Sequence, residues 1–292
     1  MQPERNSASA DRIDSRVSAE HAIEKASEVA FAAFSRWRQS PLASDLLEAE
    51  RAELSVILDK LFGYHLLILG ANGAEELTSI SPVAHHIRVS GIAPALGDSE
   101  STLISPLNAL PLQNDSVDVV LLNHCLEFSH DPRGVLREAV RVLRPGGHIL
   151  LLGFQPASLW GLKSVLLRIC YRCKLLTVRG PWGGRFLGSR RLLDWLALLE
   201  IQSRPTRYFK HGFALEHPWL RAKLTRGNGA LERWLRSRVD GRGLPGGSVA
   251  LLWGVKESRP LTPSASSWRR SLKSTLPVSA APLRESPSQS KM

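Results

Sequence analysis

Two closely spaced glycines follow an apolar run in the first third of the chain. Gly70 and Gly73 come directly after residues 66–69, Leu-Leu-Ile-Leu, and precede a helical pattern. In such a loop the backbone N–H groups and a helix N-terminus can approach a bound ligand, and a glycine matters because a side chain would block that approach. The loop residues Gly70, Ala71, Asn72 and Gly73 are therefore predicted to bind a cofactor.

A second polar group, Asn123-His124-Cys125, ends the apolar run over residues 117–122. Open α/β sheets bind ligands at the carboxyl ends of their strands, so this loop is expected to lead into a pocket. Asn123 and His124 are candidates for contacts to a cofactor or a substrate. An imidazole titrates near neutral pH, which makes His124 the candidate catalytic base; the alternative is a histidine with a purely structural role.

The polar residues that follow have weaker assignments. Glu127 is predicted to be a structural hydrogen-bonding group, and His130 is a candidate contact to a substrate. Cys170 and Cys173 form a C-x-x-C pair without a second pair, which leaves a metal or redox role and two packed thiols as alternatives. Three cysteines are too few for a disulfide framework, and no metal is predicted.

From His65 onward, short apolar runs alternate with helical patterns, which is typical of βα units and a mostly parallel sheet. The predicted strands cover residues 66–69, 87–92, 117–122, 149–153, 202–209 and 249–255. The clearest helix covers residues 132–143, with Asp131 as its N-cap and Pro132 in its first turn. Two further helices are predicted before the first strand, over residues 17–38 and from Pro41 to Leu61.

The predicted organisation has four parts. Residues 1–16 form a disordered lead-in, residues 17–64 the N-terminal helices, residues 65–257 the main α/β domain, and residues 258–292 a disordered basic tail rich in Ser and Pro. Within the main domain, residues 154–188 are predicted to be a basic insertion.

The insertion carries an apolar stripe at helical spacing. Its residues are Leu159, Leu162, Leu166, Ile169, Cys173 and Leu176. Such a stripe packs on the protein's own core, or it faces a membrane surface or a lipid-like substrate; the pattern leaves these alternatives open. Trp160 and Trp182 either wall an apolar substrate pocket or pack the insertion onto the sheet.

The net charge of +11 is distributed unevenly. Residues 1–159 contain 13 Lys or Arg and 20 Asp or Glu, whereas residues 160–242 contain 18 and 5. The basic half favours a phosphate-rich partner, either an anionic membrane surface or nucleic acid, with a solvated basic face as the alternative. No apolar run approaches the roughly 18 residues that cross a bilayer, and no secretory signal stands at the N-terminus, so we expect a cytoplasmic protein.

Five motifs follow one another between Leu110 and Phe154. They are Leu110-Pro111-Leu112, Asp118-Val119-Val120, the loop from Leu126 to Pro132, the helix from Arg137 to Leu143, and Arg144-Pro145-Gly146-Gly147. In order and spacing they resemble the central part of the type 11 methyltransferase domain, a class I S-adenosylmethionine-dependent family. With the flanking segments, the resemblance covers about Val17 to Lys256 and is closest to a proteobacterial subgroup. It implies a Rossmann-like fold, with helices on both faces of a central, mostly parallel sheet, and S-adenosyl-L-methionine as cofactor.

The segment 65–77 stands where this family has its first strand and glycine loop, but several family residues are replaced. The pattern G-x-G-x-G reads here as Gly-Ala-Asn-Gly-Ala, and no carboxylate stands at residues 90–92, where the family holds the ribose hydroxyls. The aspartate that would receive the adenine amino group falls on Pro106, with Asn108 as the nearest polar substitute. The cofactor-binding residues that the resemblance implies are Gly70, Ala71, Asn72, Gly73, Asn108, Ala109, Leu110 and Asn123.

The implied activity is transfer of a methyl group to a small or lipid-like acceptor. Such a transfer depends mainly on positioning, with a base needed only for a protonated acceptor, so the absence of a catalytic triad does not exclude it. Each lost carboxylate removes a charge-assisted hydrogen bond of about 1.5 to 3 kcal/mol. Two other hypotheses stay open: a catalytically weakened, methyltransferase-like binding or scaffold protein, which these losses suggest, and a methyltransferase directed at nucleic acid, which the basic half of the chain suggests.

Overall fold

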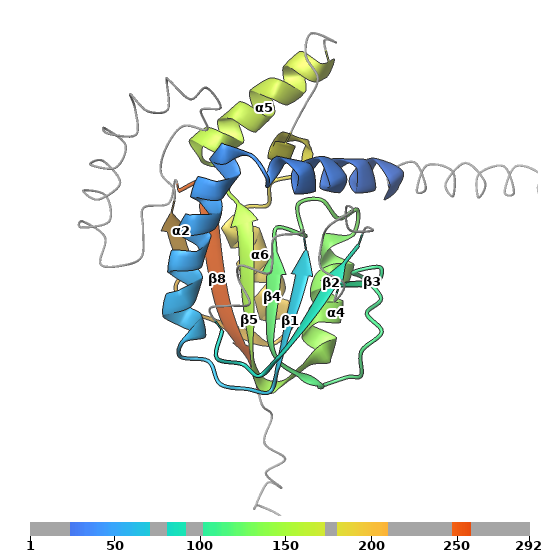
Figure 1. The fold of residues 1–292 in the computed structure, drawn as a ribbon, viewed down its shortest axis with the longest axis vertical. Helices are drawn as coiled ribbons and strands as arrows, with labels where there is room; N and C mark the ends of the chain where they lie inside the picture. Colours follow the sequence, from blue (N-terminus) through green and yellow to red (C-terminus); the bar gives the residue numbers. More distant parts are fainter. Residues whose placement is uncertain (1–23, 71–80, 92–101, 173–179, 210–246, 258–292) are drawn as a thin grey trace, which may run out of the picture. The chain divides into compact units, whose positions relative to one another are not determined.

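The computed structural model describes five stretches of the chain, residues 24–70, 81–91, 102–172, 180–209 and 247–257 (Figure 1). The predicted lead-in over 1–16 and the predicted tail over 258–292 lie outside these described residues. The described part contains an eight-stranded sheet. Its strands are β1 (His65–Gly70), β2 (His85–Ser90), β3 (Thr102–Ile104), β4 (Val117–Asn123), β5 (Leu143–Phe154), β6 (Ile201–Ser203), β7 (Arg207–Phe209) and β8 (Val249–Lys256).

Buried aliphatic side chains form the centre of the sheet. Residues 66–69 of β1 and 119–122 of β4 are buried on both faces, as expected for strands between two helical layers. The predicted strands at 66–69, 117–122 and 249–255 are confirmed, each as part of a slightly longer strand, and the strand predicted at 149–153 is the second half of the longer β5. The strand predicted at 87–92 instead covers His85–Ser90.

Two edges of the sheet differ from the prediction. β3 was not predicted, because it has only three residues and its side chains are mostly exposed. The strand predicted at 202–209 is divided into β6 and β7, which both pair with β8. Pro205 lies at the break and has no backbone N–H to donate to a neighbouring strand.

The strands are arranged in the order β3-β2-β1-β4-β5-β8-β6, with β7 also paired to β8. The first five strands in this order are parallel, and β8 runs antiparallel to β5. After β1 the chain builds β2 and β3 on one side and then returns to place β4 and β5 on the other. The strand order thus reverses between β1 and β4, the position at which open α/β sheets bind ligands.

Helices cover both faces of this sheet (Figure 1). One face packs against the N-terminal helix (residues 24–37), α2 (Pro41–Leu58), α5 (Leu159–Arg172) and the short 3-10 helix η1 (Gly180–Gly183). The other face packs against α4 (Pro132–Val142) and α6 (Ser189–Leu198). The predicted Rossmann-like α/β class is confirmed, because a layer of helices covers each face of a mostly parallel sheet.

The helix starts follow from local sequence. α2 begins after Ser40, whose hydroxyl accepts a hydrogen bond from the N–H of Ala43 at 3.3 Å. α4 begins after Asp131, whose carboxylate accepts from the N–H of Gly134 at 2.9 Å, as its sequence predicted. In both helices a proline occupies the first turn, where its missing N–H costs nothing.

The insertion is fixed to the sheet through its tryptophans. Trp160 of α5 and Trp182 of η1 are both buried, with ring centroids 5.6 Å apart, and Trp160 stacks on Phe154 at 5.8 Å. Packing onto the sheet is therefore the correct alternative for these two residues. The described stripe residues Leu159, Leu162, Leu166 and Ile169 are instead exposed, so the first of the two alternatives, packing on the protein's own core, is wrong for them.

The remaining stripe residues, Cys173 and Leu176, lie outside the described residues. Within the described part of the chain, every helix is too short or too polar to span a bilayer.

Candidate functional site

Gly70 and Asn123 end β1 and β4 side by side at the point where the strand order reverses. Gly70 has a φ of 139°, and a Cβ added to it would stand 2.1 Å from the carbonyl oxygen of Asn123. Only glycine fits this contact, because any side chain would overlap the neighbouring backbone. The ends of β1 and β4 can therefore lie in close contact at the edge of the sheet where the predicted site lies.

Asn123 carries an unused amide at this edge. Its side chain is fully buried, and neither Oδ1 nor Nδ2 has a hydrogen-bond partner among the described residues. A buried amide without partners costs free energy, so such groups in native proteins usually mark a bound water or ligand. The predicted role of Asn123 in cofactor binding is compatible with this position and stays a prediction.

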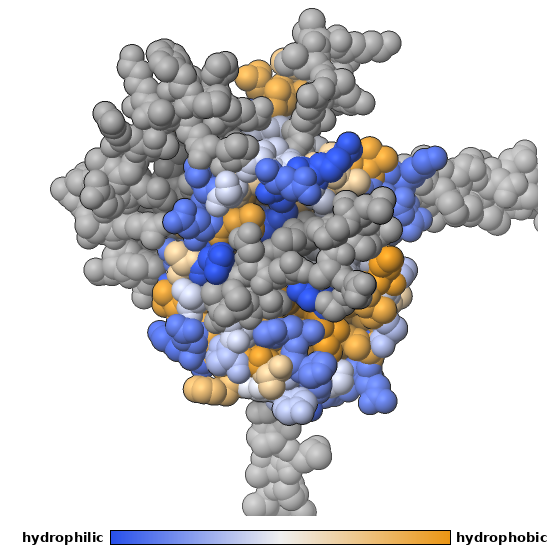
Figure 2. Space-filling view, viewed as in Figure 1, coloured by the Kyte–Doolittle hydropathy of each residue, from blue (hydrophilic) through white to orange (hydrophobic). Residues whose placement is uncertain are grey.

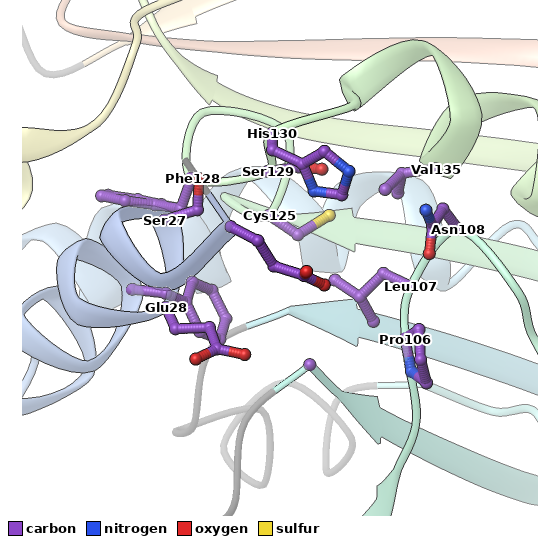
Figure 3. A pocket seen from close by; sticks show the side chains of 13 residues that line it. Ser27, Glu28, Pro106, Leu107, Asn108, Cys125, Phe128, Ser129, His130 and Val135 are labelled. Carbon is purple, nitrogen blue, oxygen red and sulfur yellow. The ribbon is translucent and has the colours of Figure 1, made fainter. Parts of the chain in front are cut away.

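A cleft opens at the same carboxyl edge (Figure 3). Its cavity volume is about 100 Å³, and the space around it, open solvent included, is about 570 Å³. It is formed by the N-terminal helix, the end of β2, the loop after β3, the loop after β4 and the start of α4. The residues that line it are Glu24, Ser27, Glu28, Phe31, Gly91, Pro106, Leu107, Asn108, Cys125, Phe128, Ser129, His130 and Val135.

Two carboxylates reach this cleft from the N-terminal helix. Glu24 and Glu28 are one helical turn apart and line the same cleft as Gly91, the residue that directly follows β2. In Figure 3 the side chain of Glu28 lies beside the N-terminal helix, on the opposite side of the cleft from Pro106. The sequence lacks a carboxylate at the end of β2, and these two glutamates place negative charge in that part of the site. No local motif could have identified them, because their relevance depends on where the N-terminal helix packs.

Of the predicted loop residues, Asn108 lies in the cleft, whereas Ala109 and Leu110 do not line it. The N–H of Ala109 donates to Pro106, and the N–H of Leu110 donates to the Glu138 carboxylate at 3.0 Å. Leu110 is also buried in the core. Their backbone N–H groups are thus engaged in holding the loop, and their predicted contact to a cofactor stays a prediction.

The other predicted loop residues, Ala71, Asn72 and Gly73, lie outside the described residues. Their assignment stays a prediction. Of the C-x-x-C pair, Cys173 also lies outside, and no cluster of metal-binding side chains occurs within the described stretches.

His124 sits beneath this edge, between two carboxylates. Its Nε2 lies 2.8 Å from Oε1 of Glu50 in α2, and its Nδ1 lies 3.1 Å from Oε1 of Glu127. The side chains of His124 and Glu50 have no exposed surface, and Arg38 lies 3.7 Å from the other oxygen of Glu50. The imidazole also packs against Phe154, with ring centroids 4.2 Å apart. This group of four residues, Arg38, Glu50, His124 and Glu127, is called the buried ion cluster below.

The buried ion cluster keeps its histidine charged. Burial alone would lower the pKa of His124, but the charge of Glu50 and the hydrogen bonds with Glu127 and Glu50 outweigh it and raise the pKa to about 9. Burial would raise the pKa of Glu50, yet the charge and hydrogen bond of His124, together with the charge of Arg38, lower it. A protonated imidazole has no lone pair to accept a proton. The geometry therefore favours the structural alternative for His124 over the predicted role as a catalytic base.

Glu127 has the structural role that the sequence indicated. Its Oε1 accepts a hydrogen bond from the backbone N–H of Phe154 at 2.7 Å, in addition to its contact with His124. Cys125 lines the cleft, but burial, followed by the charge of Glu127, raises the pKa of its thiol well above the ordinary value. His130 remains as an exposed imidazole at the cleft.

Comparisons with known proteins place this geometry in context. Residues 63–151 match a family model described as a methyltransferase domain. The uncharacterized protein YafS of Escherichia coli is 34% identical over 166 residues, which is 57% of this chain and 64% of that protein. The malonyl-[acyl-carrier protein] O-methyltransferase of Hahella chejuensis is 41% identical over 68 residues, which is 23% of this chain and 21% of that protein.

The match thus spans less than two thirds of the length of each of these relatives. Among solved structures, a SAM-dependent methyltransferase from Archaeoglobus fulgidus aligns with a TM-score of 0.49 and 16% identity, over 72% of this chain and 94% of that chain.

Proposed function

We propose that this protein transfers a methyl group from S-adenosyl-L-methionine to a small or lipid-like acceptor, a proposal supported by the match of residues 63–151 to a family model described as a methyltransferase domain. The observation that carries the proposal is the cleft at the carboxyl edge of the sheet, next to the reversal of strand order. Ligands of folds with this topology bind at that position.

The cleft contains groups that suit the proposed cofactor. The carboxylates of Glu24 and Glu28 can accept hydrogen bonds from ribose hydroxyls or from an ammonium group, and the amide of Asn108 can both donate and accept at the edge of an adenine ring. Phe31 and Leu107 offer apolar surface to the faces of that ring. When bound, the cofactor supplies a methyl group activated on a positively charged sulfur.

The chain's own residues then position the acceptor and, where needed, take its proton. His130 is the imidazole that lines the cleft, so we assign it the role of proton acceptor for acceptors that start protonated. His124 supports the site indirectly, because the buried ion cluster fixes the loop after β4 against α2. Most of the rate enhancement is expected to come from alignment of the two reactants.

Calorimetry with the full chain tests cofactor binding. Titration with S-adenosylmethionine and with its demethylated product should release heat, and both Glu28→Gln and Asn108→Ala should weaken the affinity about tenfold, the effect of losing roughly 1.4 kcal/mol. Glu48→Gln is the matched control, because Glu48 is an exposed carboxylate of α2 that does not line the cleft. It should bind as the unaltered protein does.

The outcomes separate the proposed function from its alternatives. If millimolar cofactor produces neither heat nor a thermal shift, the enzyme proposal fails and the binding or scaffold protein remains. If the cofactor binds, incubation with methyl-labelled S-adenosylmethionine and separate pools of lipids, small molecules and RNA identifies the acceptor. Label recovered in RNA alone would favour the methyltransferase directed at nucleic acid.

A further inference from the structure

α5 presents a continuous apolar stripe to solvent. Leu159, Leu162, Val165, Leu166 and Ile169 are each between 41% and 64% exposed, and together they are called the α5 stripe. Their spacing of three, three, one and three residues places them within an arc of about 120° on a helix with 3.6 residues per turn. In Figure 2, hydrophobic surface appears at the top of the view, where Figure 1 shows α5.

The opposite side of α5 is anchored in the protein. Trp160 and Ser164 are buried, and the Ser164 hydroxyl donates to the carbonyl of Trp182 at 3.3 Å. Gly161 approaches the carbonyl of Pro156 so closely that an added Cβ would stand 2.0 Å from it. The stripe is therefore held outward by a fixed helix, and its exposure does not result from fraying of an isolated segment.

The stripe lies in a basic part of the sequence. Residues 159–193 contain eight Lys or Arg residues and no Asp or Glu. Lys163 of α5 lies 4.4 Å from the Trp182 ring, and Arg168 donates a hydrogen bond to the carbonyl of Gly184. Burial, followed by the charge of Arg185, lowers the pKa of Arg168.

This combination identifies the partner by its chemistry. An apolar stripe flanked by cations fits the boundary of an anionic bilayer, where acyl chains cover the apolar side chains and lipid phosphates attract the Lys and Arg residues. The phosphates of a nucleic acid would also attract the Lys and Arg residues. A nucleic acid, however, offers no apolar phase for the five exposed aliphatic side chains. A partner protein would need a matching acidic rim around its own apolar groove.

We propose that α5 docks this protein onto anionic membrane surfaces, with the α5 stripe entering the boundary between headgroups and acyl chains. α5 begins five residues after β5 ends, at the same carboxyl edge of the sheet that carries the cleft. Docking through α5 therefore turns the cleft edge toward the bilayer. The docking itself does not depend on the proposed methyl transfer, and its test does not require activity.

Vesicle flotation of the full chain tests the proposal. The unaltered protein should bind vesicles of equal parts phosphatidylglycerol and phosphatidylcholine at least about tenfold more tightly than vesicles of phosphatidylcholine alone, and less tightly as salt rises. The triple substitution Leu162→Gln, Leu166→Gln and Ile169→Gln should weaken binding to the anionic vesicles by at least about tenfold. Because all three side chains are exposed, the variant should keep the thermal stability of the unaltered protein.

A matched control separates the α5 stripe from hydrophobic surface in general. Val29, Phe62 and Leu198 are between 61% and 83% exposed and lie outside α5, so their triple substitution by Gln should leave vesicle binding unchanged. Equal binding of the stripe variant and the unaltered protein would overturn the proposal. So would RNA binding that competes with the vesicles and ignores the stripe substitutions, or a dimer that the same substitutions dissociate while vesicles bind neither form.

Discussion

At the scale of single residues, the clearest result concerns the histidine at the end of β4. His124 has a φ of 50°, which places a non-glycine residue in the left-handed region, and its backbone N–H donates to the carbonyl of Leu152 at 3.1 Å. Such a conformation persists only where surrounding interactions impose it. Here the carboxylates of Glu50 and Glu127 form hydrogen bonds with the two ring nitrogens of His124. The residue that looked most like a catalytic base is thus a structural link between α2 and the sheet.

The raised pKa of His124 predicts how stability depends on pH. The imidazole has a pKa of about 9 in the folded protein, compared with its ordinary value of 6.5. Its contribution to the free energy of unfolding is therefore complete below about pH 6.5. The contribution is lost as the pH rises through about 9. Denaturant unfolding at pH 6, 7.5 and 9.5 should show stability falling across this range.

Glu50→Gln identifies the buried ion cluster as the source of that pH dependence. Removing one partner of a buried pair should lower the free energy of unfolding by about 3 to 5 kcal/mol at pH 6, and the decline above pH 6.5 should become shallower. Glu48→Gln, an exposed change on the same helix, should leave both the stability and its pH dependence unaltered. An unchanged pH profile in the Glu50 variant would show that other groups control it.

Gly70 provides a second prediction for a single residue. Gly70→Ala forces a Cβ to within 2.1 Å of the Asn123 carbonyl oxygen at a positive φ, whereas Gly146, with a φ of 79°, has open space where its Cβ would stand. Both variants carry backbone strain of roughly 1 to 3 kcal/mol, but only the first also separates β1 from β4. Thermal unfolding should therefore show a larger loss of stability for Gly70→Ala than for Gly146→Ala. Equal losses would mean that the strands adjust to the contact without cost.

At the scale of elements, α4 fixes the loop that carries Asn108. The guanidinium of Arg141 donates to the carbonyls of Leu110 and Leu112, and it pairs with Glu138 at 2.8 Å. The hydrogen bond from Arg141, ahead of the opposing effect of desolvation, lowers the pKa of Glu138, and that carboxylate also receives the N–H of Leu110. One turn of helix thus holds three backbone groups of the loop at the cleft.

Arg141→Lys tests whether the hydrogen bonds of Arg141 fix this loop. A lysine keeps the charge but loses the planar fork that reaches both carbonyls, so the variant should be less stable by about 1 to 3 kcal/mol. Its affinity for S-adenosylmethionine should also fall, because Asn108 is no longer held in place. Arg137→Lys, on an exposed position of the same helix, is the control and should match the unaltered protein in urea unfolding and in calorimetry. A stable Arg141 variant with reduced affinity would still support this role of Arg141, whereas no change in either measurement would contradict it.

At the scale of the whole domain, the N-terminal helices are part of the sheet's core. Phe34 is fully buried, stacks on Phe128 at 4.7 Å and meets the rings of His124 and Phe154. The same helix contributes Glu24 and Glu28 to the cleft. Folding of the domain and assembly of the candidate site therefore depend on the same helix.

Phe34→Ala measures this dependence. Removing a buried phenyl ring should lower the free energy of unfolding by about 3 to 5 kcal/mol and should shift far-ultraviolet and tryptophan signals together in one transition. Val29→Ala, a change at a side chain that is 61% exposed on the same helix, should alter stability by less than about 0.5 kcal/mol. If the helix signal melted separately, before the sheet, the helix would be an appendage of the domain.

The family motifs predicted the fold well because they are fold-forming residues. Asp118 accepts the N–H groups of Tyr64 and His65 and pairs with Arg144 at 2.8 Å, which joins β1, β4 and the start of β5. Arg141, likewise from a family motif, holds the loop before β4. These residues specify architecture, and they contribute nothing to the choice of acceptor.

The amino-acid sequence by itself predicted most strands, most helices and the mostly parallel sheet, and it placed the candidate ligand site at the carboxyl edge of that sheet. Hydrophobic periodicity, helix caps and turns depend on residues that are near one another in the chain. They can therefore be recognised from the sequence without coordinates. Only the tertiary structure decided that His124 is enclosed by Glu50 and Glu127, that Glu28 reaches the cleft, and that α5 leaves its apolar side uncovered. Each of these depends on which distant element packs where, and burial, charge pairing and exposure are properties of that packing.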